Sequence, residues 1–394
     1  MRRANDAVFR YGPKLLAPVG ALLIAFAISA AVLGFAGHSA ADAFQQMFDF
    51  GQLPDSQVDI INRATSYYIA AVAVAIGFRM GLFNIGVDGQ YRIATLAAAA
   101  LGSASFMGWL PGVGRIVIMV LVAMALGAAW AAIAGALKVA RGVSEVISTI
   151  MLNAIAGGIV AYLNTTDHWG VQLKGSNAVS TRLLPKDTWL PNLHLISGTE
   201  AGVNAFAIVA VLVGVGYWLL IERTRFGFDL RASGYNPTAA AASGVNAKRM
   251  VVMTMALSGG VAGLVGLSQL FGESHAFTDS VGGIGFTGIA IALLGRNHPV
   301  GMALGALLWS FLDRSSLILD LADIPREIVV IMQGSTVVAV VVAYELANRL
   351  TRRAQQRRVG VSTGAVVPVV GAPAGAGAGT TGDAGTESVE EKQP

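Results

Sequence analysis

Ten long apolar windows, separated by short polar connections, constrain what this chain can fold into. An α-helix needs about 20 apolar residues to cross the hydrocarbon core of a bilayer, and shorter segments are tolerated inside a bundle. Charged residues make up only 13% of the chain, whereas soluble domains carry about 25%. The pattern therefore predicts an all-α, polytopic membrane protein with about ten transmembrane helices. The windows are 15–37, 65–80, 93–110, 115–137, 146–163, 203–221, 250–271, 283–295, 299–318 and 327–347.

Basic residues indicate which connections face the cytoplasm, because short cytoplasmic loops are enriched in Lys and Arg. Every second connection carries them, whereas the intervening ones, such as 38–62 and 272–282, are acidic or neutral. This alternation predicts that both termini are cytoplasmic. The net charge of +4, without a basic cluster in the apolar body, does not suggest nucleic acid as a partner. The connections predicted to be cytoplasmic are the amino terminus, the turn with Arg79 and Arg92, the turn with Lys138 and Arg141, the loop 222–249 and the segment after Asn348.

The two ends of the chain differ in composition. The apolar stretch 15–37 follows four basic residues; it is longer than the apolar region of a signal peptide, so we expect it to remain as the first span. Residues 359–394 are a low-complexity run of Gly, Ala, Pro, Thr and Glu, which cannot bury apolar area. We therefore divide the chain into a transmembrane domain, 1–349, and a disordered cytoplasmic tail, 350–394.

The residues needed for most enzyme chemistry are missing or scattered. The chain has no cysteine, which excludes disulfides, thiolate metal sites and cysteine nucleophiles. Its histidines fall on separate predicted loops, and no pair has the spacing of metal ligands. A GxxxxGK[ST] phosphate loop is also absent, so we do not expect the chain to hydrolyse ATP by that route. The sequence predicts neither an enzyme nor a metal or cofactor site.

Glycines and polar side chains interrupt the apolar pattern in the segment 78–92, FRMGLFNIGVDGQYR. Non-helical backbone at membrane depth persists only where it is buried in protein or lines a water-filled cavity. If the segment enters the bilayer, its helix ends can present backbone groups to a polar solute, as in transporters. The alternative is an ordinary cytoplasmic turn with a glycine-rich cap. The interrupting residues are Gly81, Asn84, Gly86, Asp88, Gly89 and Gln90.

A second segment, 283–301, repeats this plan with a glycine-rich entry, a short apolar run and a polar turn. Two short, glycine-interrupted hydrophobic units in separate halves of a chain suggest an internal repeat around a central pathway. The resemblance between the two segments is one of layout only. Arg296 and His298 in the second segment are interpreted as a cytoplasmic anchor, because basic residues in loops usually report orientation.

Small residues and one long connection give two further expectations. Gly259 with Gly263, and Gly301 with Gly305, have the spacing at which helix backbones approach closely. We expect tight packing within one bundle, with a dimer seam as the alternative. The external segment 165–202 mixes Pro, Asn, Asp and Lys, and is expected to form an ordered loop with a short helix around Thr188.

The loop 222–249 is predicted to contain a short helix. Pro237 can begin that helix, Asn236 can cap it, and Gly244 can end it in a left-handed conformation. Such a helix, packed under the bundle and exposing Arg231 and Tyr235, would suit a soluble partner that pushes on the membrane domain. A surface helix lying on anionic headgroups is the alternative.

Four stretches of the sequence resemble the permease subunits of bacterial ABC importers, in the branch that includes sugar, branched-chain amino acid and nucleoside permeases. Residues 81–90, GLFNIGVDGQ, are similar to the family's FNIGxEGQ stretch, with Asp88 where Glu is more usual. Residues 231–246, RASGYNPTAAAASGVN, resemble the family's RAxGxNPxAAxxxGI stretch, which docks on the ATPase. Residues 145–153 and 285–301 look closest to the nucleoside permeases. The resemblance covers residues 60–345.

The resemblance implies a type II importer fold in the bacterial inner membrane. Such permeases work in a bilayer as a pair of membrane subunits with two ABC ATPase subunits and an extracytoplasmic solute-binding protein. Because nucleoside systems usually pair two different permeases, a heterodimer is expected rather than a homodimer. The expected function is ATP-driven import of a small polar solute, preferably a nucleoside. A sugar such as ribose or galactose, an ion-gradient-driven secondary transporter and a non-transport scaffold remain alternatives.

The candidate site residues fall into two groups. Polar groups inside a membrane are costly and are therefore candidates for function; amides and a carboxylate can hydrogen-bond ribose hydroxyls, and an aromatic face can stack on a base. Hydrogen bonding between helices is the alternative for each of them. The candidates for pathway lining are Asn84, Asp88, Gln90, Asn153 and Phe286. The candidates for ATPase coupling are Arg231, Asn236, Pro237 and Gly244, supported by Arg225 and Phe226.

Overall fold

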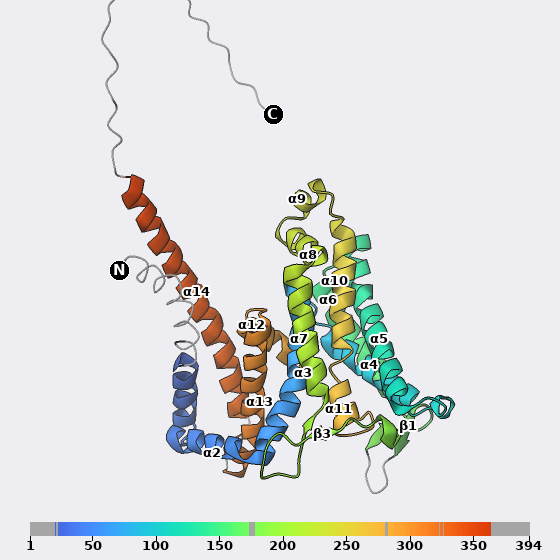
Figure 1. Cartoon of the computed structure of the whole chain (residues 1–394). Helices are drawn as coiled ribbons and strands as arrows, with labels where there is room; N and C mark the ends of the chain where they lie inside the picture. Colours follow the sequence, from blue (N-terminus) through green and yellow to red (C-terminus); the bar gives the residue numbers. More distant parts are fainter. Residues whose placement is uncertain are drawn as a thin grey trace, which may run out of the picture. The chain divides into compact units, whose positions relative to one another are not determined.

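A computed structural model describes residues 20, 23–172, 178–279, 283–322, 324–325 and 327–363. Within these residues the chain is almost entirely helical, and its only strands form two short antiparallel hairpins (Figure 1). The helices are α2 (Ala40–Gln52), α3 (Pro54–Phe78), α4 (Val87–Gly102), η1 (Ser105–Met107), α5 (Gly112–Arg141), α6 (Glu145–Leu163), η2 (Lys186–Thr188), α7 (Phe206–Arg223), α8 (Arg225–Tyr235), α9 (Pro237–Ala242), α10 (Ala247–Ala262), α11 (Leu267–Gly272), α12 (Ile284–Leu294), α13 (Pro299–Leu321) and α14 (Glu327–Thr363). The strands are β1 (Gly170–Gln172), β2 (Val179–Thr181), β3 (Asn192–Leu193) and β4 (Val203–Asn204).

Seven described helices are long and apolar enough to cross a membrane. The helix Leu23–Phe35 and α2 follow one another with a bend of 117° between them. If this bent pair is counted as one span, the described residues contain eight spans. These helices confirm the predicted all-α, polytopic class. Two of the predicted windows, 93–110 and 283–295, do not form full-length spans. They correspond to the shorter helices α4 and α12, of 16 and 11 residues. At 1.5 Å per residue, the shorter helix covers about 17 Å, roughly half of a bilayer's hydrocarbon core.

Helix α3 lies at the centre of the bundle, where it packs against α7, α10, α12 and α13. Its central stretch, 69–76, is at most 1% exposed, and most of it is Ala and Val. Small side chains let several helices approach one another closely around it. By contrast, most of the apolar residues on α5, α6 and α7 remain exposed. In a membrane protein such exposed apolar faces are solvated by lipid.

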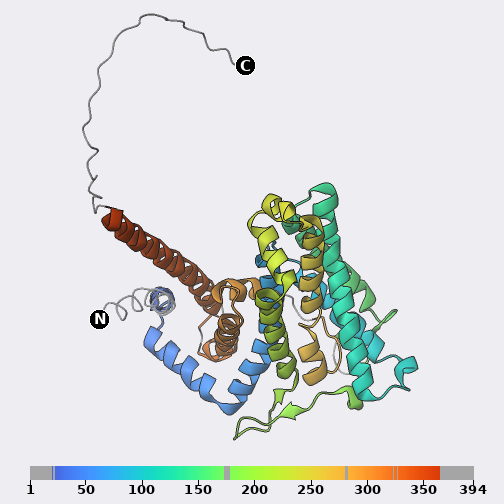
Figure 2. The same ribbon diagram turned by 45° about the horizontal axis from the view of Figure 1, so that its top comes forward.

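The closest helix crossing joins α5 to α10, which lie side by side (Figure 2). A Cβ atom added to Gly127 would lie 2.2 Å from the carbonyl oxygen of Gly259, and one added to Gly263 would lie 2.2 Å from that of Ala123. Similarly, a Cβ on Gly301 would lie 2.5 Å from the carbonyl oxygen of Gly295. These glycines are used inside the bundle, which confirms the expected tight packing within one chain.

The connection between α6 and α7 is an ordered cover on one end of the bundle. It contains both hairpins and the 3-10 turn η2 at Lys186–Thr188, which confirms the short helix expected near Thr188 and an ordered loop over the described residues 165–172 and 178–202. The amide of Thr181 donates to the carbonyl of Phe277, and the Trp189 ring stacks on His275 with ring centroids 3.8 Å apart. The cover is therefore attached to the segment 273–279 that follows α11.

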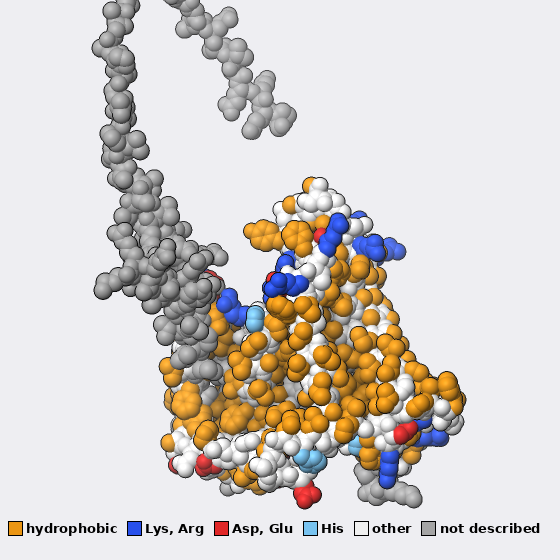
Figure 3. All heavy atoms as spheres, in the orientation of Figure 1, with side chains coloured by type: hydrophobic (Ala, Val, Ile, Leu, Met, Phe, Trp, Pro, Cys, Tyr) orange, Lys and Arg blue, Asp and Glu red, His pale blue; other side chains and the backbone are white. Residues whose placement is uncertain are grey.

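The opposite end of the bundle carries α8 and α9. In the face shown in Figure 3, basic side chains gather around these helices, acidic side chains lie mainly at the other end, and a broad hydrophobic band separates them. This distribution is typical of a membrane protein whose basic end faces the cytoplasm.

The chain divides into two compact units, Met1–Ala347 and Asn348–Pro394. In the second unit, α14 continues to Thr363. It therefore runs past the predicted start of the tail at residue 350, in a stretch rich in Arg and Gln, which favour helix. The remainder of the predicted disordered tail, 364–394, lies outside the described residues.

Candidate functional site

The segment after α3 folds back into the bundle instead of forming a surface turn. The amide of Leu82 donates to the carbonyl of Gly77, and Gly81 has a φ of +73°. A Cβ on Gly77 would lie 2.8 Å from the carbonyl oxygen of Leu82, so the returning backbone lies directly against α3. Asn84 is 0% exposed. Of the two interpretations of residues 78–92, the structure favours entry into the protein.

Asn84 and Gln90 form a closed amide pair. The Asn84 Nδ2 donates to Gln90 Oε1 at 2.9 Å, and Gln90 Nε2 donates back to Asn84 Oδ1 at 2.8 Å. Asn84 Nδ2 also donates to Ser258 Oγ at 2.8 Å, and that hydroxyl donates to the carbonyl of Ala73. The pair joins the turn to α10 and α3. For Asn84 and Gln90 the structure therefore shows hydrogen bonding between helices, which was the alternative to their lining a pathway.

Asp88 joins the first turns of the two short helices. It lies at the start of α4, is 6% exposed, and its Oδ1 accepts from the amides of Gly283 and Gly285 at the start of α12, at 3.0 and 3.2 Å. A carboxylate is stabilised near helix N-termini, where N–H groups lack partners within the helix. Its second oxygen, Oδ2, is buried without a hydrogen-bond partner among the described residues. Asp88 is therefore the charged contact between α4 and α12.

The remaining predicted pathway residues lie in different surroundings. Asn153 on α6 accepts from the amide of Gly89 at 2.9 Å and donates to the carbonyl of Ile85 at 2.8 Å. Like the amide pair, it holds the start of α4 in place. Phe286 on α12 is 56% exposed, unlike the buried Asn84, Asp88 and Gln90. The structure thus brings together four of the five predicted residues and leaves Phe286 on the surface.

A polar cluster that the sequence did not predict lies one turn further along α4. Arg92 donates to both carboxylate oxygens of Asp279 at 2.7 Å, and its Nε donates to Oδ1 at 3.1 Å. This bidentate geometry is the strong form of an Arg–carboxylate pair. The two side chains are only 21% and 27% exposed. They border a small cavity of about 30 Å³ whose other polar residues are Ser66, Tyr91, Thr95, Gln269, Ser274 and Thr278.

The Arg92 pair corrects part of the predicted topology. The basic-residue pattern placed Arg92 in a cytoplasmic turn and Asp279 in a connection on the opposite side, yet the two side chains are in direct contact. The reason is that α4 already begins at Val87, so Arg92 lies inside a helix. The loop that carries Asp279 returns to meet it within the bundle. Arg92 directly precedes the predicted window 93–110, so counting it as a loop residue concealed its place in a helix.

The break between α10 and α11 forms another wall of this cavity. Residues 263–266 interrupt the helix, and a Cβ on Gly266 would lie 2.2 Å from the hydroxyl oxygen of Thr95. The Thr95 hydroxyl donates to the carbonyl of Tyr91. A broken helix beside a charged pair is the arrangement found at the binding sites of transporters.

A second charged network connects the bundle to α8. Arg79 donates to the Tyr217 hydroxyl at 3.1 Å and to the carbonyl of Asn297 at 3.0 Å, and it lies 3.5 Å from Glu222. Glu222 in turn accepts from Arg231 at 3.0 Å. Arg231 is thus partly buried and paired, which corrects the expectation that it is exposed for a partner. Through Glu222 and Arg79, this network connects α8 with the turn between α12 and α13.

The predicted short helix in this loop is present as α9. Asn236 Oδ1 accepts from the amides of Thr238 and Ala239, Pro237 is the first helical residue, and Gly244 has a φ of +84°. These three structural predictions are confirmed. Tyr235 is 95% exposed, as expected.

Two side chains that sequence reasoning did not pair make this end suitable for a protein partner. Phe228 and Tyr235 on α8 are 61% and 95% exposed among basic residues. Arg225 begins the same helix, whereas Phe226 is partly buried and packs against the core. Exposed aromatic side chains beside basic ones are typical of residues that dominate protein interfaces.

Among the described residues, no three metal-ligating side chains gather in one place. The described residues offer hydrogen bonds and ion pairs: a charged pair with a small polar cavity near α4 and α12, and a separate charged network between α8 and the turn after α12.

Comparison with known proteins identifies relatives over most of the chain. The model of the family "Branched-chain amino acid transport system / permease component" matches residues 56–341. The chain is 34% identical to the guanosine ABC transporter permease protein NupP of Bacillus subtilis, over 84% of this chain and 94% of that protein. No solved structure matches.

Further relatives carry different solute names. The nucleoside ABC transporter permease protein NupB of Lactococcus lactis is 28% identical, over 84% of this chain and 92% of its own length. A glucose ABC transporter permease protein of Haloferax volcanii is 29% identical, over 92% of this chain and 93% of its own length. A second guanosine permease protein of Bacillus subtilis, NupQ, is 27% identical, over 69% of this chain and 86% of its own length.

Proposed function

Because the chain belongs to the family of branched-chain amino acid transport system permease components, we propose that it is the membrane subunit of an ATP-driven importer of nucleosides. The family assignment confirms the resemblance found in the sequence: the chain is a multi-pass ABC permease of the cell membrane. The observation that supports transport of a polar solute is the Arg92–Asp279 pair, held beside the Asp88 contact between α4 and α12. Charged groups inside an apolar bundle are costly and are kept where a solute or ion passes.

The proposed solute is a nucleoside rather than a sugar. Three of the four relatives named above are guanosine or nucleoside permeases, and among these four the guanosine permease NupP has the highest identity to this chain. The glucose permease relative keeps a sugar, such as ribose or galactose, as the second candidate. In both cases the solute has several hydroxyl groups, which the charged and amide groups near α4 can hydrogen-bond.

We infer a membrane domain of ten segments with both termini in the cytoplasm. Eight spans follow if the bent pair is counted as one, and adding the half-length helices α4 and α12 to these eight gives ten. The basic end with α8 and α9 would face the cytoplasm. The meeting of α4 and α12 at Asp88, each after a glycine-rich break, also supports the internal repeat suggested by the two segments. In this division residues 1–349 form the permease domain and 350–394 the tail.

The proposed partners act on opposite ends of the bundle. The ATPase subunits would dock on α8 and α9, through Phe228 and Tyr235, with Arg225, Phe226, Asn236, Pro237 and Gly244 shaping that surface. An extracytoplasmic binding protein would deliver the solute to the other end. A second, different permease would complete the pathway, because Bacillus subtilis has two proteins named as guanosine permeases, NupP and NupQ, that are both similar to this chain.

In the proposed mechanism, ATP binding moves α8, and the network of Arg231, Glu222 and Arg79 carries the movement to the turn at Asn297. That turn follows α12, whose other end is held by Asp88. Displacement of α12 would alter the Asp88 contact and open the Arg92–Asp279 pair. Asn84, Gln90 and Asn153 would keep the start of α4 rigid during this change, and Phe286 would face the pathway from the exposed side of α12.

The solute and the energy source are tested together by uptake into proteoliposomes that contain the chain, its ATPase, the second permease and the binding protein. We expect ATP-dependent uptake of labelled guanosine that excess glucose does not reduce and that an ionophore does not abolish. Uptake of glucose alone would establish the sugar alternative. Uptake that collapses with the ion gradient and needs no ATPase would establish a secondary transporter, and neither uptake nor ATPase association would favour a scaffold.

The docking surface gives a separate prediction. Replacing both Phe228 and Tyr235 with serine is expected to reduce solute-stimulated ATPase activity of the reconstituted complex by more than about tenfold, since central aromatic residues each contribute about 2 kcal/mol or more to an interface. The amount of protein in the membrane should not change, because both side chains are exposed. ATPase activity under saturating solute is the measurement.

A matched control for this double variant lies on a different helix. Leu121 on α5 is 59% exposed and lies away from α8 and α9, and Leu121→Ser should leave ATPase stimulation unchanged. If the double variant couples as well as the unaltered protein does, α8 is not the docking surface.

A further inference from the structure

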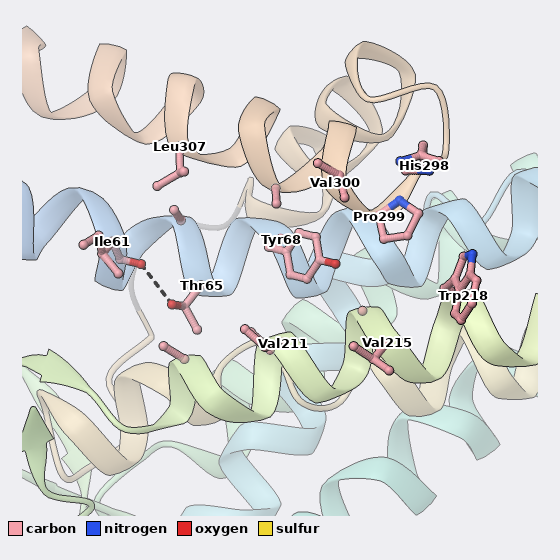
Figure 4. Close-up of a pocket in the computed structure, with 15 residues that line it drawn as sticks. Ile61, Thr65, Tyr68, Val211, Val215, Trp218, His298, Pro299, Val300 and Leu307 are labelled. Carbon is pink, nitrogen blue, oxygen red and sulfur yellow. Dashed lines mark hydrogen bonds between the residues drawn. The ribbon is translucent and has the colours of Figure 1, made fainter.

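An open groove runs between α7 and α13 on the outside of the bundle, with α3 as its floor. Its volume is about 550 Å³. Figure 4 shows Val211 and Val215 on α7, and Val300 and Leu307 on α13, which line the groove. The groove is separate from the polar cluster around Arg92 and shares none of its residues.

The wall of this groove is almost entirely apolar. Thr65 is one of its few polar residues, and its hydroxyl donates to the carbonyl of Ile61 within α3, at 2.9 Å (Figure 4). The other polar side chains include Tyr68 on the floor and, at one end, Trp218 and His298. A nucleoside or sugar would find too few partners here for its hydroxyl groups, and burying them unpaired is costly. The groove therefore suits a hydrocarbon chain.

The groove continues into a charged cavity of about 350 Å³ at the end of α7. The two share Trp218, His298 and Pro299. Arg79 and Glu222 line this cavity and pair with each other. Arg223 also lines it, and its guanidinium lies 5.0 Å from the centre of the Trp218 ring. Two arginines against one glutamate leave the cavity with a net charge of +1, counting His298 as neutral.

We propose that the groove and the charged cavity together bind one anionic phospholipid of the cytoplasmic leaflet. One acyl chain lies between α7 and α13, and the phosphate lies beside Arg223. The inference rests on charge complementarity: the cytoplasmic leaflet carries anionic headgroups, and basic pockets between helices on that side bind them. It uses the orientation in the proposed function, with the end that carries α8 in the cytoplasm.

The bound lipid would have a consequence for coupling. Its headgroup would lie against Glu222 and Arg79, the two residues that transmit movement from α8 to the bundle. A negative phosphate nearby competes with Glu222 for the arginines. The lipid would thus become part of the contact between the docking surface and the pathway.

The test is lipid retention, measured by native mass spectrometry after extraction from vesicles of equal parts phosphatidylglycerol and phosphatidylcholine. We expect the full chain to retain phosphatidylglycerol about fivefold over phosphatidylcholine, the equivalent of about 1 kcal/mol for one basic residue near the headgroup. Arg223→Gln should remove this preference while still retaining lipid. Ala303→Trp, which fills the groove, should abolish retention of both lipids.

Matched controls separate this site from general attraction to a membrane. Arg249→Gln removes an exposed charge at the start of α10, and Val117→Trp enlarges an exposed side chain on α5; both should leave retention unchanged. A phosphatidylglycerol preference that survives Arg223→Gln, or lipid retention by Ala303→Trp equal to that of Val117→Trp, would overturn the proposal.

A second measurement identifies the occupant directly. Because the chain has no cysteine, Ala303→Cys introduces a single thiol into the groove. Its alkylation by a membrane-soluble maleimide should be slow in phosphatidylglycerol vesicles and fast in phosphatidylcholine vesicles. Protection that instead rises with protein concentration, in either lipid, would show that a second polypeptide covers the groove, and the lipid proposal would fail. Neither measurement depends on which solute is transported.

Discussion

Replacing Arg92 with methionine is expected to reduce solute uptake by at least about tenfold while the protein remains in the membrane. The variant keeps an unbranched, flexible side chain but leaves the Asp279 carboxylate without its bidentate partner. Removing one partner of a buried pair costs about 3–5 kcal/mol; because these side chains are 21% and 27% exposed, solvent screens part of that cost. Even about 1.4 kcal/mol in the translocation step corresponds to a tenfold loss of rate.

The measurement is the initial rate of guanosine uptake per amount of protein in reconstituted vesicles. Arg314→Met is the matched control, because Arg314 pairs with Asp59 at 2.9 Å and is 19% exposed, but lies outside the polar cluster. It should change uptake by less than about twofold, as expected for a peripheral ion pair. Exchanging the two charges, with Arg92→Asp and Asp279→Arg together, should restore part of the uptake. Normal transport by Arg92→Met would remove this pair from the pathway.

Replacing Gly259 with valine is expected to destabilise the helical bundle strongly. A Cβ at this position would lie 2.2 Å from the carbonyl oxygen of Gly127, and a backbone atom cannot rotate away as a side chain can. Overpacking a core costs about 1–3 kcal/mol and more where the surroundings cannot yield; we expect about 3 kcal/mol or more here. That is a large fraction of the 5–15 kcal/mol that stabilises a typical folded protein.

Thermal unfolding of the purified protein in detergent measures this effect. The Tm of Gly259→Val should fall by roughly 5 °C or more, and the yield of monodisperse protein should fall with it. Gly216→Val is the control, because it introduces the same β-branched side chain into a helix, at a glycine on α7 with no atom within 4 Å of the added Cβ. An equal Tm for both variants would mean that α5 and α10 do not pack as closely as described.

The sequence predicted those features that depend on neighbouring residues along the chain. The apolar windows predicted an all-α membrane protein, and the motifs at 81–90 and 231–246 predicted its family. Helix α9 was also predicted correctly, because a cap at Asn236, a proline at the next position and a glycine at the end act through the local backbone. Each of these signals lies within a few residues of the structure that it specifies.

The candidate site was predicted only in part. Asp88 and Asn153 were selected as polar residues, but the sequence did not reveal that one contacts the start of α12 and the other the start of α4. Arg92 was assigned to the wrong place, because counting basic residues assumes that each lies in the nearest loop. The partner of Arg92 is 187 positions away in the chain.

The apolar pattern by itself determined that the chain forms a helical bundle in a membrane, because each window must avoid water whatever its neighbours do. The tertiary structure decided which polar side chains meet. Those contacts depend on how far the segments 79–86 and 273–279 fold back between the helices, and that depth follows from the packing of glycines against distant backbone. Pairing of charges is a property of three-dimensional distance, which periodicity along a chain does not contain.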